Sequence, residues 1–358
     1  MRGVIYSARG EELRELKEVS YGEVEYAHGH GSTTVTLSRQ SSDYADEPEF
    51  WRGQEMSGRM LLLEQDNGLD DWVGVVTHVN EREGEGLLRV RVAGPEQAVQ
   101  RTVIRRRLRF AGSPTDTFRR VLNGGVRRDG YPIGVDPDSE DTDTDLSGPL
   151  MPQSLYRLLE GFRKDNGHEW TVSPRVTASG LLRLEVTIRR HIGSRYPGRA
   201  RINSGVDILA DGLERESDGT HRINHVVAIG KASQGGKVPI VEAQLERDVD
   251  EHGPMSTVIH RPEIHDEGRL LKAAQAALRE LSHVFVNLAV RITNGNREDV
   301  YGELGVGDDL EVDVEGWGLT QTRVMGYSYS PEPEGDEGLT LVLRNRHSMP
   351  EEGVQIDE

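Results

Sequence analysis

The sequence predicts a mainly β protein with α+β insertions, in which two related β-barrels are joined to inserted helix-containing domains. Composition gives the first indication, because 41 glycines in 358 residues and a hydrophobic content of only 35% favour many strands and turns over long helices. The second indication is a repeated pattern. A strand-like run, an acidic turn containing glycine and a second apolar run occur near residue 75 and again near residue 325.

The two copies of this pattern are far apart in the chain. Each first run holds one glycine, Gly74 in one copy and Gly326 in the other, and each copy is preceded by a further apolar run and a turn. A distant duplication of a small β unit predicts two similar barrels in one chain. The first copy comprises residues 72–79, 80–86 and 87–92, and the second comprises residues 322–329, 330–338 and 339–343.

Residues 1–112 are predicted to form the first barrel, with strands at 33–37 and 59–63 and the hairpin around Gly84. Residues 113–200 are predicted to form an inserted α+β domain. Ser113-Pro114 is typical of a helix N-cap followed by proline at the first helical position, and Gly124-Gly125 ends that helix. An acidic loop is expected at residues 136–145.

A second helix is predicted to begin near Pro152 and to end at Asn166-Gly167. Its apolar residues are spaced i, i+3, i+4 and i+7, which places them on one helical face: Leu155, Leu158, Leu159 and Phe162. The alternation of apolar and polar residues over 182–189 predicts a half-buried strand, and we expect the helix to pack against it.

The second barrel is predicted to comprise residues 201–235 and 284–346, with residues 207–215 and 224–230 as paired strands. The inserted segment 236–283 carries a helix at 267–281. The apolar face of this helix is predicted to be Leu270, Leu271, Ala274, Leu278 and Leu281. Residues 347–358 are predicted to be a flexible tail.

Charge and composition exclude several classes of protein. A formal net charge of −18 at pH 7 should repel nucleic acid. The chain has no cysteine, which excludes disulfides, thiolate metal sites and a cysteine nucleophile. The N-terminal residues 1–9 lack the apolar core of a signal peptide, and no apolar run approaches membrane-spanning length.

Local motifs give little support for catalysis or ligand binding, so we expect no catalytic residue, cofactor or metal. Residues 230–237 lack the spacing of a phosphate-binding loop, and residues 136–145 lack the glycine and terminal glutamate of an EF-hand. Neither the pair His28 and His30 nor the group around His265 has a zinc-protease spacing, although a weak metal site stays open. Serine–histidine–aspartate chemistry has no nucleophile elbow to support it.

The basic run at residues 101–109 holds five arginines and could contact nucleic acid. In so acidic a chain we expect it instead to pair with acidic surface on a neighbouring subunit, or to be a solvated strand face. We therefore take Arg105 and Arg107 as candidate interface residues, together with Trp72, Gly74 and Gly326 from the repeated pattern.

Four stretches, taken in their order along the chain, resemble the baseplate hub family of tailed phages, also called tail-tip hub or tail-associated minor tail proteins. The resemblance covers most of residues 55–345. Residues 72–79 resemble the first-barrel strand of that family, and residues 158–170 resemble its helix leading into a G-x-x-W strand. Residues 224–236 resemble its mid-chain glycine loop, and residues 304–312 together with 323–326 resemble its closing barrel.

The resemblance implies a structural protein of the virion, placed at the tail tip after assembly in the host cytoplasm. Three copies would form a ring, and two similar barrels in each copy would give that ring pseudo-sixfold symmetry. The implied partners are a sixfold tail tube or distal tail ring protein, a threefold tip fibre or spike, and the tape measure protein. DNA would pass through the ring without stable binding. Many relatives continue into an endopeptidase or fibre region, so a chain of 358 residues is expected to be a hub alone.

Two alternatives stay open at the level of sequence. One is a β-rich glycan- or peptidoglycan-active enzyme, which would need a pair of carboxylates facing a cleft. The other is a distal tail or tube ring protein, which would be expected to have one barrel per chain and six copies. The number of protomers in a purified ring distinguishes among these possibilities.

Overall fold

A computed structural model describes most of the chain, and every structural statement below refers to the described residues. These are residues 2–17, 19–21, 24–27, 31–65, 70–82, 86–126, 130–140, 146–166, 168–193, 201–203, 207–218, 222–232, 236–262, 264–282, 285–292, 304–314, 318–330 and 338–345.

The N-terminal part of the chain forms a seven-stranded antiparallel sheet in the order β2-β1-β6-β7-β8-β5-β3. Three short helical turns, α1 (Ser42–Ala45), η1 (Pro48–Trp51) and α2 (Gly53–Met56), lie between its strands β5 and β6. The strands are β1 (Arg2–Tyr6), β2 (Glu12–Leu16), β3 (Val19–Tyr21), β5 (Ser32–Ser38), β6 (Met60–Glu64), β7 (Trp72–Arg82) and β8 (Leu87–Ala93).

The central strands of this first sheet, β1, β6 and the start of β7, are buried on both faces, each face in a different core. Successive side chains of a strand point to opposite faces. In β6, accordingly, Leu61 and Leu63 pack into one core with Trp51 and Trp72, whereas Met60 and Leu62 pack into the other. That other core is shared with the middle segment of the chain, so the first sheet and the middle segment are packed as one body.

The middle segment packs helices and two small sheets against the first sheet. Its sheets have the orders β10-β13-β12 and β11-β9. Ser113 caps α4 by accepting a hydrogen bond from the backbone N–H of Asp116, and Pro114 is the first helical residue. The elements are α3 (Glu96–Arg101), β9 (Leu108–Gly112), α4 (Pro114–Gly124), β10 (Ile133–Val135), β11 (Leu146–Leu150), α5 (Leu155–Asn166), β12 (Glu169–Val176) and β13 (Leu182–Arg189).

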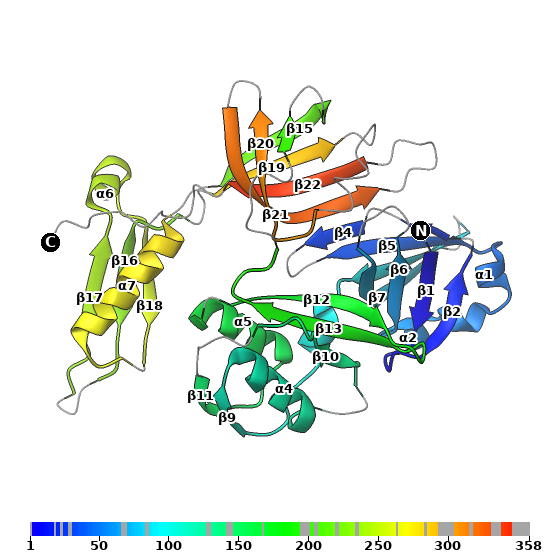
Figure 1. The fold of residues 1–358 in the computed structure, drawn as a ribbon, viewed down its shortest axis with the longest axis horizontal. Helices are drawn as coiled ribbons and strands as arrows, with labels where there is room; N and C mark the ends of the chain where they lie inside the picture. The colour runs from blue at the N-terminus through cyan, green and yellow to red at the C-terminus, as the bar shows by residue number, and fades with distance from the viewer. Residues whose placement is uncertain are drawn as a thin grey trace.

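The C-terminal half forms a second large sheet in the order β14-β20-β21-β22-β19-β15, and β4 (Val24–Ala27) from the N-terminal part pairs with β21 beside it. Figure 1 shows this sheet above the first sheet and the middle segment. Its strands are β14 (Arg201–Asn203), β15 (Ile208–Asp218), β19 (Phe285–Ile292), β20 (Asp309–Val314), β21 (Gly318–Ser330) and β22 (Gly338–Asn345).

The two large sheets share a strand order. The successive strands β5 to β8 are arranged as β6-β7-β8-β5, and the successive strands β19 to β22 are arranged as β20-β21-β22-β19. The register also shifts at comparable places, between Val76 and His78 in β7 and between Val324 and Gly326 in β21. Counted from these bulges, Gly326 corresponds to His78, so the two glycines of the repeated pattern do not occupy equivalent positions.

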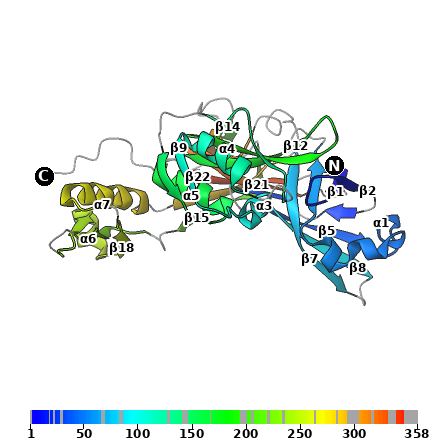
Figure 2. The ribbon, with the colours of Figure 1, turned by 90° about the horizontal axis from the view of Figure 1, so that it is seen from below.

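A small α/β domain of residues 222–282 stands apart from the rest of the molecule in Figures 1 and 2. Its sheet has the order β17-β16-β18, and α7 covers one face of that sheet over a separate core. The elements are β16 (His225–Ile229), β17 (Ile240–Gln244), α6 (Glu246–His252), β18 (Ser256–His260) and α7 (Glu267–Leu281).

This domain corrects one predicted pairing. Residues 207–215 and 224–230 do form strands, but they do not pair with each other: β15 pairs with β19, whereas β16 pairs with β17 and β18. Both runs alternate apolar and polar residues, and alternation does not specify a partner. The predicted helix at 267–281 is confirmed, but Leu271 is exposed and lies outside its buried face.

The predicted helices at 114–124 and 155–166 are also confirmed, as is the strand at 182–189. The expectation that this strand is half-buried holds at Arg183 and Arg189 but fails at its centre, where Glu185 and Thr187 on the polar face are buried as well. Glu185 accepts a hydrogen bond from Arg175, and Thr187 donates one to Asp136, which satisfies their polar atoms. The fold is therefore mainly β, as the composition and patterning predicted.

Candidate functional site at the junction of the two large sheets

The two large sheets are joined by a strand that crosses from one to the other. β4 pairs antiparallel with the end of β21, from Gly326 opposite Ala27 to Tyr329 opposite Val24. Val24 is fully buried in the core of the first sheet, whereas Tyr327 and Tyr329 are buried in the core of the second. The main-chain pairing therefore connects two hydrophobic cores.

A second contact at the junction is a bidentate ion pair between Glu169 at the start of β12 and Arg323 in β21. The two guanidinium nitrogens donate to the two carboxylate oxygens, each over 2.6 Å. Arg323 also donates to the carbonyl oxygens of Gly307, at 3.0 Å, and Ile192, at 2.9 Å. These bonds tie the middle segment to the second sheet.

The electrostatics of Glu169 agree with this geometry. Burial by itself raises the pKa of its carboxyl, but the hydrogen bonds from Arg323 and from the backbone N–H of Ile192, together with the positive charge of Arg323, outweigh burial, so the pKa is lowered. Because a lowered pKa means that folding favours the ionised form, the charged pair stabilises the junction at neutral pH.

Two glycines allow the backbones to cross closely beside this ion pair. Gly193 has φ of +91° and Gly307 has φ of +100°, a region that residues with a Cβ rarely adopt. A Cβ on Gly307 would lie 2.3 Å from the carbonyl oxygen of Ile192, and a Cβ on Gly193 would lie 2.2 Å from the carbonyl carbon of Gly307. The crossing therefore requires glycine on both backbone segments.

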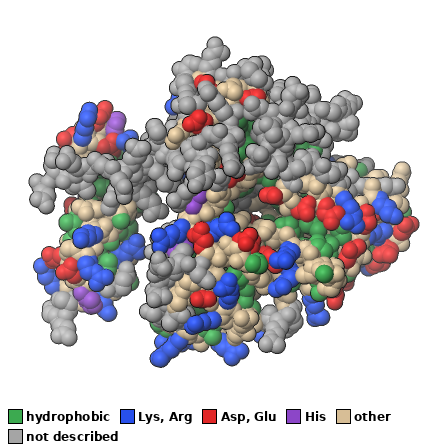
Figure 3. All heavy atoms as spheres, viewed as in Figure 1, with side chains coloured by type: hydrophobic (Ala, Val, Ile, Leu, Met, Phe, Trp, Pro, Cys, Tyr) green, Lys and Arg blue, Asp and Glu red, His purple; other side chains and the backbone are tan. Residues whose placement is uncertain are grey.

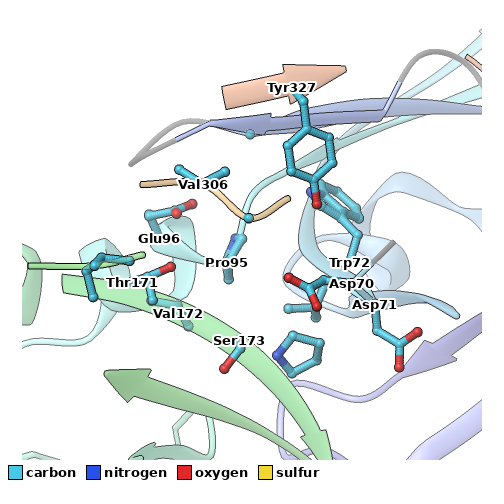
Figure 4. A pocket seen from close by; sticks show the side chains of 15 residues that line it. Asp70, Asp71, Trp72, Pro95, Glu96, Thr171, Val172, Ser173, Val306 and Tyr327 are labelled. Atoms are coloured by element: carbon cyan, nitrogen blue, oxygen red, sulfur yellow. The ribbon is translucent and has the colours of Figure 1, made fainter. Parts of the chain in front are cut away.

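A cavity of about 530 Å³ opens at the same junction, between the first sheet, β12 and the second sheet. We call it the junction pocket. Figure 4 shows Tyr327 reaching down from β21 beside Trp72, with Asp70 and Glu96 on opposite sides of Pro95. The lining residues are Gly31, Asp70, Asp71, Trp72, Val73, Pro95, Glu96, Thr171, Val172, Ser173, Pro174, Ile192, Gly305, Val306 and Tyr327.

The candidate interface residues fall into two groups. Trp72, Gly74 and Gly326 are buried within the chain, where Trp72 lines the junction pocket and Gly326 lies in the pairing with β4. Arg105 and Arg107 are exposed in the segment between α3 and β9. The structure brings Trp72 and the neighbourhood of Gly326 together at the junction and leaves the arginines elsewhere on the surface.

Sequence reasoning missed Glu169 and Arg323. They are 154 positions apart in the chain, and neither belongs to a motif with a recognisable spacing. One signal for Arg323 was available in the sequence. Arg323 is a charged residue within the run 322–329, which was predicted to be a strand. That signal indicates a partner without saying which one.

Within the described ranges, no three His, Asp or Glu side chains come together as a metal-ligand set. The pair His28 and His30 lies outside the described residues. No helix of the described part of the chain is both long enough and apolar enough to span a bilayer.

No family model and no curated protein matches the chain, but solved structures do. It matches a tail protein from Neisseria meningitidis MC58 with a TM-score of 0.60 and 11% identity, over 98% of both chains. It matches the 43 kDa tail protein of prophage MuSo2 from Shewanella oneidensis with a TM-score of 0.62 and 11% identity, over 98% of this chain and 100% of that one.

A third match is the prophage tail protein gp18 from Listeria monocytogenes EGD-e, with a TM-score of 0.56 and 12% identity, over 96% of this chain and 94% of that one. Three tail proteins thus share the fold over nearly their whole length. The chain has the fold of phage tail proteins, as its resemblance to the baseplate hub family predicted.

Proposed function

We propose that this protein is the structural hub of a phage tail tip, in which three copies form a ring. Each copy would contribute two related barrels, built on the two large sheets, so that the ring presents six similar barrels to a sixfold tail tube or distal tail ring protein. The same three copies would present a threefold surface to a tip fibre or spike. The protein acts by geometry and is not an enzyme.

The observation that carries this proposal is the shared strand order of the two large sheets, with a bulge at a comparable place in β7 and β21. Two similar units at a fixed relative placement are what a pseudo-sixfold ring requires. The β4–β21 pairing and the Glu169–Arg323 ion pair supply that fixed placement. The fold that this chain shares with three tail proteins over nearly its whole length supports the functional part of the proposal.

The charge of the chain suits a conduit for DNA. A net charge of −18 repels phosphates, whereas a wall rich in Lys and Arg would hold them by counterion release. The five exposed arginines of residues 101–109 would then lie away from the channel, at a contact with acidic partner surface. The tape measure protein would be a further partner during assembly, and the protein would reside in the virion tail.

Counting the copies in intact tails tests the proposal. Particle images of the tail tip, averaged without imposed symmetry, should show three copies of this chain in one ring. Six copies per ring would instead identify a distal tail or tube protein. A gel-shift assay at low salt with duplex DNA should give no stable complex. Tight binding that Arg105→Glu and Arg107→Glu abolish would overturn the passive conduit and the placement of these arginines.

A further inference from the structure

The basic run at residues 101–109 is exposed and has no acidic partners in the described part of the chain. None of its five arginines forms an ion pair there, and all of them are exposed: Arg101, Arg105, Arg106, Arg107 and Arg109. Figure 3 shows Lys and Arg side chains gathered along the lower edge of the molecule, in the region where Figure 1 places β9 and α4. We call residues 101–109 together with Met151 the basic surface.

The absence of partners is unexpected in a chain that holds 61 Asp and Glu residues against 43 Lys and Arg residues. Other exposed arginines do pair with acids, as Arg2 does with Glu15 and Arg163 with Glu160. Neighbouring arginines repel one another, and without carboxylates beside them only solvent and salt reduce this repulsion. A partner that brings carboxylates to the basic surface would therefore be attracted to it.

The backbone that carries the arginines is fixed. Ile104, in the middle of the run, is fully buried, and its N–H donates to the carbonyl oxygen of Gln153 over 2.8 Å. The N–H of Arg105 donates to the carbonyl oxygen of Gly125 over 3.0 Å. A partner thus meets arginines on an ordered backbone, so that only their side chains lose freedom on binding.

Two large apolar side chains lie exposed on the same surface. Val103 is 49% exposed and Met151 is 58% exposed. They belong to two stretches that run antiparallel, because Val103 pairs with Ser154 and Leu108 pairs with Leu150. Met151 therefore lies beside the middle of the basic run. The basic surface combines apolar contact area with positive charge.

This combination favours a carboxylate-rich protein segment over nucleic acid. A guanidinium group binds a carboxylate through two parallel hydrogen bonds, and an aliphatic side chain between carboxylates would cover Val103 and Met151. A phosphate backbone offers no such side chain. A duplex would also bring a long row of phosphates against a chain with a net charge of −18, whereas a short acidic segment carries its charge only where the arginines are.

We propose that the basic surface docks an acidic segment of another tail protein, with carboxylates on both sides of an aliphatic side chain. The carboxylates pair with the arginines at 105–107, and the aliphatic side chain packs on Val103 and Met151. The proposal gives the contact with an acidic partner surface its chemistry, and it rests on the function proposed above for the statement that the neighbour is a tail protein.

The first experiment measures binding of the acidic peptide Glu-Glu-Leu-Glu-Glu-Leu-Glu to the full chain by fluorescence anisotropy. The peptide should bind, and the same peptide with Gln in place of Glu should not. Arg105→Glu combined with Arg107→Glu should weaken binding about tenfold, because two attractive pairs become repulsive. The control, Arg247→Glu combined with Arg269→Glu at exposed arginines of the small domain, changes the net charge equally and should have little effect. Equal effects of the two double variants would overturn the proposal.

The apolar contact distinguishes a protein segment from nucleic acid. Val103→Thr and Met151→Gln keep the size of the side chain, and each should weaken peptide binding about threefold, the loss expected when part of an apolar side chain is covered in a contact. Val176→Thr, at a valine that is 44% exposed in β12, should have no effect. Unchanged affinity in the first two variants would refute the proposal, as would duplex DNA that binds more tightly than the peptide through the same arginines.

The second experiment captures the partner in assembled tails with a carbodiimide, which joins a lysine directly to a carboxylate. Arg106→Lys puts a reactive amine in the basic run and keeps its charge, and Arg247→Lys is the matched control in the small domain. Mass spectrometry should show a link from position 106 to an Asp- and Glu-rich segment of another tail protein. A link only to a second copy of this chain, or no link beyond that of the control, would count against the proposed partner.

The outcomes separate this contact from the hub itself. Three copies in one ring, with neither peptide binding nor a link from position 106, would leave the hub standing and remove the contact. Peptide binding and a link from position 106 in a ring of six copies would keep the contact and remove the trimeric hub.

Discussion

Glu169 and Arg323 lie 154 residues apart in the sequence and form the ion pair that ties β12 to β21. Their side chains are 21% and 17% exposed, so the pair is largely shielded from solvent. Shielding strengthens the attraction, and it also makes the loss of one partner costly, because the remaining charge stays partly buried. This ion pair therefore contributes to the fixed arrangement of the middle segment and the second sheet, beside the backbone crossing at Gly193 and Gly307.

Replacing Arg323 by Met should lower the free energy of unfolding by about 2–3 kcal/mol, somewhat below the range for fully buried pairs because both groups retain some solvent contact. Urea denaturation at pH 7 measures the change. The matched control is Arg52→Met, which breaks the exposed pair with Glu49 and should change stability by less than about 0.5 kcal/mol. Equal effects of the two substitutions would contradict the stabilising role of the junction pair.

The lowered pKa of Glu169 gives a second test at the same pair. Because folding lowers this pKa, the stabilisation is fully present above the ordinary value of 4.5, and it is lost as the pH falls below 4.5 through the lowered value. The destabilisation caused by Glu169→Gln, measured by urea denaturation, should therefore shrink as the pH is reduced below 4.5. A constant difference over that pH range would show that the charge of Glu169 does not contribute.

Gly307→Ala tests the close backbone crossing. The added Cβ would meet the carbonyl oxygen of Ile192 at 2.3 Å, in addition to the strain of a positive φ. Gly180→Ala is the matched control, because Gly180 also has a positive φ, +78°, but no atom lies within 4 Å of the point that a Cβ on Gly180 would occupy. Thermal unfolding should show a loss of about 1 kcal/mol for Gly180→Ala and a clearly larger loss for Gly307→Ala.

At the scale of elements, α5 shows how local pattern and tertiary packing agree. Leu155, Leu158, Leu159 and Phe162 lie on one face by their spacing, and all four are buried in the core shared by the first sheet and the middle segment. Leu182, Leu184, Val186 and Ile188 of β13 belong to the same core. The helix and the strand that the sequence paired with it therefore share one core, in which α5 also contacts α3 and β12.

Leu158→Ala should lower the free energy of unfolding by about 2–5 kcal/mol, because Leu158 is only 5% exposed and its truncation leaves a cavity. Chemical denaturation of the purified chain measures this loss. Met151→Ala, at a methionine that is 58% exposed, should cost less than about 0.5 kcal/mol. If Leu158→Ala left stability unchanged but abolished assembly, this helix face would be a docking groove for a partner.

At the scale of the whole molecule, the small domain is an insertion into a hairpin. Asp218, the last residue of β15, is paired with Phe285, the first residue of β19, and residues 219–284 leave and return at this point. The domain has its own core, separate from the cores of the two large sheets. The second sheet can therefore close its β15–β19 pairing without it.

Replacing residues 219–284 by Asn-Gly should give a folded protein, because this dipeptide favours the two-residue turn of an antiparallel hairpin. Circular dichroism should show that the shortened chain is folded with a high content of β structure. Its urea denaturation midpoint should be close to that of the full-length protein. The control variant carries Pro-Pro in place of Asn-Gly. Proline has no backbone N–H to donate and does not adopt the two-residue hairpin turn, so the control should be less stable than the Asn-Gly variant. An unfolded Asn-Gly variant would show that the small domain supports the second sheet.

The sequence by itself determined the mainly β class, the helices at 114–124, 155–166 and 267–281, and the resemblance to phage tail proteins. These depend on local spacing, capping residues and the order of apolar runs, all of which are written along the chain. Tertiary structure alone decided that β16 pairs with β17 and β18, that β4 joins the second sheet, and that Glu169 meets Arg323. The physical reason is that strand partners and ion pairs are chosen by which surfaces meet after the chain collapses, and an alternating pattern fits many partners equally well.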